Sequence, residues 1–155
     1  MPELEIERKF LVDTKKVKEF LSENTERVTI KVIEQVYLQR EPEEIRIRRT
    51  VENGNTSFVK TIKTGHGLIR TEAENETTFE EFSKACQSYS VIASKTRHCI
   101  DGLEIDFFQN GLVTVEKEFE SEATAILFDP SDYEFITDEI TGNKFYSNYE
   151  IAKRG

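Results

Sequence analysis

The chain has 155 residues and a formal net charge of −9, with 37% apolar and 33% charged residues. This length suits one compact domain over 1–155 with a real core. The acidic balance argues against non-specific nucleic-acid binding, so an anionic ligand would need a local basic site or bridging cations. No apolar run approaches the roughly 20 residues that cross a bilayer. The acidic N-terminus lacks signal-peptide features, and the spacing of Cys86 and Cys99 is typical of reduced thiols, so we expect a cytoplasmic protein without membrane contact.

The secondary structure is predicted from apolar periodicity, caps and turn residues. In chain order, the pattern predicts a strand over 3–12, a helix over 13–22, strands over 29–40, 45–51, 56–64 and 68–77, a helix over 78–90, strands over 92–100, 103–108 and 112–119, a helix over 121–128, and a helical tail with Thr141 as a candidate cap. Asn53-Gly54 and Asp101-Gly102 are hairpin signals, and His66 is expected in an exposed loop. Roughly eight strands joined by tight turns predict an antiparallel α+β fold.

Charged residues recur at every second position of the predicted strands, and residues two apart in a strand share a face. The sets that share a face are Glu3/Glu5/Glu7/Lys9, Arg46/Arg48, Arg70/Glu72/Glu74/Glu76, Lys95/Arg97, Glu104/Asp106 and Glu116/Glu118. Strand by strand, an amphipathic sheet with one solvated face would explain them. Taken together, such like charges repel one another unless opposite charges lie between them. Divalent cations and phosphate groups would supply those charges inside a sheet curled into a tunnel, with the helices outside.

Several short motifs occur in a fixed order. The first is Glu5-Ile6-Glu7-Arg8-Lys9, and the later blocks are Ile45-Arg46-Ile47-Arg48, Thr61-Ile62-Lys63, Gly67 to Glu74, Lys95-Thr96-Arg97, Glu104-Ile105-Asp106, Val115 to Phe119, and Thr141 to Asn148. Over nearly its whole length the chain resembles the CYTH, or triphosphate tunnel metalloenzyme, family, and most closely its short bacterial single-domain members. The resemblance implies an eight-stranded antiparallel β-tunnel, a closed barrel open at both ends with short helices packed outside.

The resemblance also implies roles for individual residues. The metal ligands would be Glu5, Glu7, Asp106, Glu116 and Glu118, binding Mg²⁺ or Mn²⁺. The phosphates would be bound by Lys9, Arg46, Arg48, Lys63, Arg70, Lys95, Arg97 and Lys144, whereas Glu72, Glu74 and Glu104 would belong to the tunnel wall. The catalytic set would be Glu5, Glu7, Lys9, Glu116 and Glu118. Arg8 points away from this face and is expected to be exposed to solvent.

The function that we expect is metal-dependent hydrolysis of a triphosphate, with inorganic tripolyphosphate giving diphosphate and phosphate. Phosphoryl transfer needs positioning and charge neutralisation more than covalent help from the protein. The alternatives are a class IV adenylyl cyclase, a nucleoside or thiamine triphosphatase, and a non-catalytic polyphosphate-binding module. The expected partner is a small-molecule triphosphate, and family dimers make a homodimer plausible.

Overall fold

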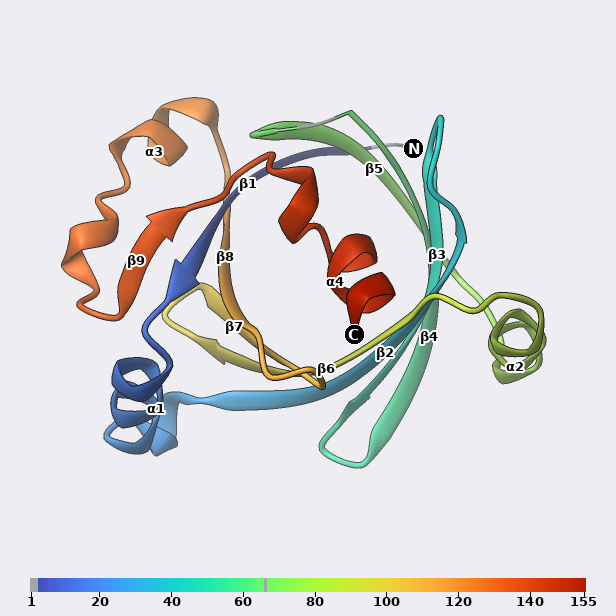
Figure 1. Ribbon diagram of the computed structural model, residues 1–155, viewed down its shortest axis with the longest axis horizontal. Helices are drawn as coiled ribbons and strands as arrows, with labels where there is room; N and C mark the ends of the chain where they lie inside the picture. Colours follow the sequence, from blue (N-terminus) through green and yellow to red (C-terminus); the bar gives the residue numbers. More distant parts are fainter. Residues whose placement is uncertain (1–2, 66) are drawn as a thin grey trace.

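The architecture is a closed antiparallel barrel in the computed structural model, which describes residues 3–65 and 67–155 and so leaves His66 outside the described residues. The eight strands are β1 (Glu3–Val12), β2 (Thr29–Gln39), β3 (Glu44–Glu52), β4 (Asn55–Thr64), β5 (Ile69–Glu76), β6 (Ile92–Ile100), β7 (Leu103–Phe108) and β8 (Val113–Phe119). They pair in the order β5-β4-β3-β2-β6-β7-β8-β1, and a β5–β1 pairing closes the ring (Figure 1). The predicted α+β barrel is thereby confirmed.

The hairpin turns follow the sequence signals. Asn53 and Gly54 between β3 and β4 have φ angles of 51° and 77°, a left-handed pair that Asn-Gly adopts with little strain. The register of each hairpin then fixes which side chains share a face. On β2 and β3, for example, Gln35 lies opposite Arg48 and Tyr37 opposite Arg46.

Three short helices cover the outside of the barrel, as expected: α1 (Thr14–Ser22), α2 (Phe79–Ser88) and α3 (Glu122–Leu127). Each begins at a side-chain cap, and these caps are Asp13, Thr78 and Ser121. Helix α1 buries Val17 and Leu21 in a cluster with barrel residues such as Ile105, whereas Phe82 of α2 packs with Val36 and Ile47. The apolar strand faces therefore point outward, as the alternation predicted. No helix in the described ranges is both long and apolar enough to cross a bilayer.

The fourth helix, α4 (Asn148–Arg154), lies inside the ring of strands in Figure 1. Tyr149 packs edge-on against Tyr37, with ring centroids 5.4 Å apart, and Ile151 is buried. The sequence predicted the helical tail but not its place, nor its cap. Ser147, not Thr141, caps the helix by accepting a hydrogen bond from the Glu150 amide. The C-terminus thus fills part of a barrel that the resemblance implied to be open at both ends.

A ninth strand, β9 (Ile136–Glu139), pairs with the end of β1 outside the closed ring, and the sequence pattern did not predict it. It also changes the surroundings of Arg8. The Arg8 guanidinium forms a double hydrogen bond with Glu139, at 2.7 and 2.9 Å, and donates to the carbonyls of Ala125 and Phe128. Arg8 does face away from Glu7 and Lys9, but α3 and β9 cover it. Its expected exposure to solvent was therefore wrong.

Candidate active site

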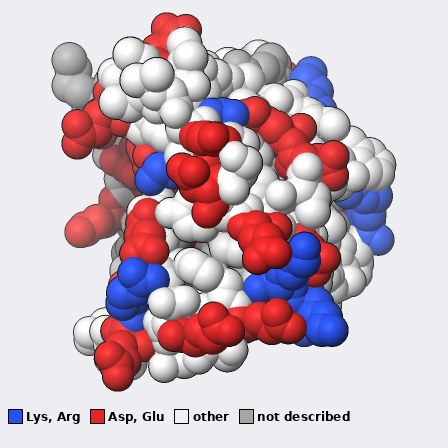
Figure 2. All heavy atoms as spheres, turned by 90° about the vertical axis from the view of Figure 1, so that its left-hand side faces the viewer, with Lys and Arg blue, Asp and Glu red and all other residues white. Residues whose placement is uncertain are grey.

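A cavity of about 250 Å³ lies inside the barrel, and charged side chains dominate its wall. Among the described residues, the carboxylates on this wall are Glu5, Glu7, Glu41, Glu44, Glu72, Glu74, Glu104, Glu116 and Glu118, and the cations are Lys9, Arg40, Arg46, Arg48, Lys63, Arg70, Arg97 and Lys144. The alternating charges of the strands therefore face one interior space. Outside, acidic groups spread widely over the face formed by α1, α3 and β9, with basic groups among them (Figure 2).

One group of interior charges is neutralised by close partners. Asp106 of β7 is fully buried, accepts a hydrogen bond from Lys95 at 2.7 Å, and accepts two from Arg97. Burial disfavours its ionised form, but Lys95 and Arg97 outweigh that effect and lower the pKa of Asp106. Neither Asp106 nor Lys95 is among the described residues that line the cavity. The metal role of Asp106 and the phosphate role of Lys95 stay predictions.

A second set of paired charges joins β1, β4 and β5. Lys63 contacts both Glu5 and Glu72 at 3.2 Å, and Arg70 donates to Glu5 at 3.1 Å. Burial raises the pKa of Glu5, and the neighbouring Glu72 adds to that rise, while Lys63 and Arg70 oppose it. These pairs face the cavity, but each cation already has a carboxylate partner. Glu74 also lines the cavity and is exposed.

Arg46 and Arg48 on β3 differ, because their positive charges are poorly neutralised. Arg46 is buried, its Nε has no hydrogen-bond partner in the described structure, and its contact with Glu44 is 3.7 Å long. Burial and the neighbouring Arg46 and Arg97 guanidinium groups lower the pKa of Arg48 to about 10. A bound anion would relieve both effects. This stretch of β3 thus has the electrostatic character of an anion site.

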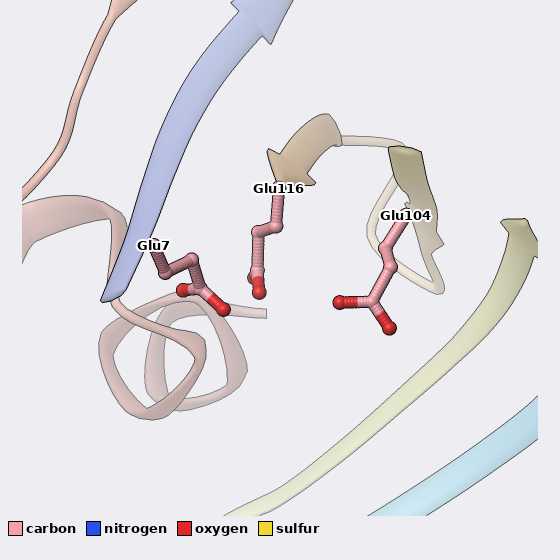
Figure 3. A group of neighbouring side chains, drawn as sticks. All are labelled: Glu7, Glu104 and Glu116. Carbon is pink, nitrogen blue, oxygen red and sulfur yellow. The ribbon is translucent and has the colours of Figure 1, made fainter. Parts of the chain in front are cut away.

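The opposite imbalance occurs where β1, β7 and β8 meet. Glu7, Glu104 and Glu116 each offer a carboxylate oxygen, and these oxygens lie within 4.8 Å of one another (Figure 3). The register explains this grouping, because Glu104 lies opposite Glu116 while Glu118, two residues along β8, lies opposite Glu7. Burial, followed by the charge of Glu116, raises the pKa of Glu7 well above its usual range. Such a carboxylate group is stabilised when a cation binds to it.

The acid cluster fits a divalent cation, because Mg²⁺ and Mn²⁺ prefer carboxylate oxygens. It contains two predicted metal ligands, Glu7 and Glu116, together with Glu104, which the sequence assigned to the tunnel wall. Burial opposes ionisation of Glu116, but Lys9, Lys95 and Arg97 overcome it and lower its pKa well below the usual range. The other predicted ligands lie apart: Glu5 is held by Lys63 and Arg70, Glu118 is exposed on the cavity wall, and Asp106 is buried behind it.

Comparison with known proteins gives matches among solved structures alone: no family model and no curated protein matches the chain. The inorganic triphosphatase NE1496 is 28% identical, with a TM-score of 0.59, and the match covers 96% of this chain and 93% of that one. The fold is therefore similar to that of an inorganic triphosphatase.

Two further solved structures share the fold at lower identity. PH1819 from Pyrococcus horikoshii OT3 is 17% identical over 97% of this chain and 98% of its own, with a TM-score of 0.67. A Bacillus halodurans protein provisionally named an adenylate cyclase is 19% identical over 94% of this chain and 99% of its own, with a TM-score of 0.68. At these identities the likeness concerns the fold alone.

The C-terminal segment also lines the cavity, which the sequence reasoning missed apart from Lys144. Lys9 donates from Nζ to the Tyr146 carbonyl at 2.7 Å, and the buried Asn148 Oδ1 has no hydrogen-bond partner in the described structure. Lys144 itself is exposed on the cavity wall. The Ser147 cap signal could have located the helix start. No local pattern could have shown that the segment turns into the barrel.

Proposed function

We propose that this chain is a divalent-metal-dependent triphosphatase, as the family that its sequence resembles implies, with inorganic tripolyphosphate as the first substrate to test. One observation carries the proposal. A single cavity holds two poorly neutralised arginines, Arg46 and Arg48, and a cluster of three carboxylates, Glu7, Glu104 and Glu116. A polyphosphate chain with its metal ion is the type of ligand that supplies both missing charges at once.

The carboxylates would hold Mg²⁺ or Mn²⁺, with Glu7 and Glu116 as the central ligands and Glu104 beside them. A cation held there supplies neutralisation of phosphate oxygens and a more acidic water for attack on phosphorus. The side chains of the protein bind and orient the substrate. Lys9, whose Nζ lies 3.6 Å from Glu116, sits between the acid cluster and the phosphates.

Arg46 and Arg48 would bind the phosphate oxygens, because a guanidinium group matches two such oxygens with two parallel hydrogen bonds. Lys63, Arg70 and Arg97 already have carboxylate partners, so we assign them mainly to holding the shape and charge balance of the tunnel. They remain within reach of a ligand in the cavity, since all three line its wall.

The cavity favours a compact substrate. Its volume of about 250 Å³ lies below the roughly 300–1,000 Å³ of typical small-molecule pockets. Among the described lining residues, Tyr146 is the one aromatic side chain that a nucleobase could stack on. Both features favour inorganic tripolyphosphate over ATP or thiamine triphosphate.

Phosphate release from tripolyphosphate, ATP and thiamine triphosphate, each with Mg²⁺ or Mn²⁺, tests the proposal. We expect metal-dependent turnover of tripolyphosphate, and its loss in Glu116→Gln. Formation of cyclic AMP from ATP would replace the proposal with a cyclase. Saturable binding without turnover of any triphosphate would make the protein a polyphosphate-binding module. The cytoplasmic location and the homodimer remain predictions from the sequence.

A further inference from the structure

Arg48 is oriented by a neutral side chain. Its Nε donates a 2.7 Å hydrogen bond to Oε1 of Gln35, which lies directly opposite on β2. Gln35 is completely buried. A guanidinium group can only donate hydrogen bonds, so the amide oxygen of Gln35 must face Arg48. The amide nitrogen then points to Tyr37 and donates to its hydroxyl at 2.6 Å. Both ends of the buried amide are therefore fixed.

This arrangement differs from that of the other cations deep in the barrel. Lys63 is held by Glu5, and both Lys95 and Arg97 are held by Asp106. Each of those partners orients its cation and cancels its charge. Gln35 orients Arg48 in the same way but leaves the positive charge uncompensated.

The uncompensated charge is costly to the empty protein. Burial, together with the neighbouring Arg46 and Arg97, lowers the pKa of Arg48 to about 10. A carboxylate at position 35 would relieve this repulsion with no loss of hydrogen bonds, because the Tyr37 hydroxyl can rotate and donate instead of accepting. Stability alone would therefore favour a glutamate at this position, and the glutamine keeps the charge of Arg48 available for a ligand.

We propose that Gln35 is a positioning residue that aims the Arg48 guanidinium at a polyphosphate while leaving its charge free. The inference rests on the proposed function, since it names how the same site obtains its affinity for phosphate. It concerns binding and not turnover, so it can be tested apart from catalysis.

The test is the substitution Gln35→Glu, with Gln87→Glu as a matched control. Gln87 is exposed on α2, outside the barrel, and its substitution changes the net charge of the chain by the same amount. Titration calorimetry with tripolyphosphate in EDTA measures anion binding without metal or turnover. We expect Gln35→Glu to weaken binding about tenfold to hundredfold, the range of a lost charge-assisted hydrogen bond, while its melting temperature stays equal to wild type or rises.

A merely structural role for Gln35 would lower affinity and melting temperature together, so opposite or uncoupled changes identify positioning. A second variant, Gln35→Met, keeps the size of the side chain but removes both hydrogen bonds. It should lower both quantities. Wild-type affinity in Gln35→Glu, with normal tripolyphosphate binding by wild type and Gln87→Glu, would overturn this inference and leave the proposed function standing. If wild type bound no tripolyphosphate in EDTA or with metal, the proposed function and this inference would fail together.

Discussion

Glu7→Gln separates the metal-binding role of the acid cluster from its structural role. Glu7, Glu104 and Glu116 place three carboxylate oxygens within 4.8 Å of one another, and burial strengthens their repulsion. Glutamine has nearly the same shape as glutamate but no charge. The variant should therefore bind a divalent cation poorly while the metal-free protein melts no lower than wild type, since Glu116 loses a repulsive neighbour.

The expected size follows from mass action. A metal at 100 times its dissociation constant stabilises the folded state by about 2.7 kcal/mol. For a chain of 155 residues this raises the melting temperature by roughly 5–11 °C. If the loss of one carboxylate weakens metal binding about hundredfold, the same metal concentration stabilises the variant by only about 0.4 kcal/mol, or roughly 1–2 °C.

Melting curves in EDTA, Mg²⁺ and Mn²⁺ measure these shifts, with metal-dependent phosphate release from tripolyphosphate as a second readout. Glu19→Gln is the control, because Glu19 is exposed on α1 and its substitution removes the same charge. We expect the control to keep both the full metal-induced shift and turnover. If Glu7→Gln kept a wild-type shift and rate, the cluster would not be the metal site.

Three further substitutions test other parts of the structure. Arg48→Ala should raise the dissociation constant for tripolyphosphate about tenfold to hundredfold, because a charge-assisted hydrogen bond to phosphate is lost. Arg8→Ala should lower the free energy of unfolding by about 1–3 kcal/mol in urea melts, because Arg8 ties β1 to Glu139 and α3. Ile105→Ala, in a side chain with no exposed surface, should lower it by about 2–5 kcal/mol.

Two matched controls accompany these variants. Lys60 lies on β4 opposite Ile47, on the outward face of the sheet, so Lys60→Ala should leave tripolyphosphate affinity unchanged. Ile30 is 51% exposed, so Ile30→Ala should cost less than Ile105→Ala. Equal effects of Arg48→Ala and Lys60→Ala would contradict the assignment of Arg48. Wild-type stability of Arg8→Ala would show that its hydrogen bonds to Glu139 and α3 contribute nothing net.

Alternation within single strands predicted the features that depend on one strand at a time. A strand has a side-chain period of two, so placing Phe10 on the outer face necessarily places Glu7 and Lys9 on the inner one. The same argument put Arg46 and Arg48 inside, opposite Ile47. Turn chemistry at Asn53-Gly54 then fixed the hairpin. These are local properties, and the sequence encodes them directly.

Partnerships between strands were not predictable in this way. Asp106 meets Lys95 and Arg97, and Glu104 meets Glu116, because of the register between β6, β7 and β8. A one-strand pattern contains no register, so Asp106 was grouped with the metal ligands and Glu104 with the wall. The burial of Arg8 and the inward turn of α4 depend on contacts across more than 100 residues of chain, which no local window contains.

The placement of the core explains how so acidic a chain can hold a polyanion. Most small barrels fill their interior with apolar side chains, whereas here the apolar side chains lie between the barrel and its outer helices. Val17 and Leu21 of α1 cover one part of the outer wall, and Phe82 of α2 covers another. Hydrophobic burial outside thus supports the fold, and the interior is free to hold charges. Paired charges such as Asp106 and Arg97 keep the wall neutral and ordered, so the few that remain unpaired, led by Arg48 and Glu7, act on the ligand alone.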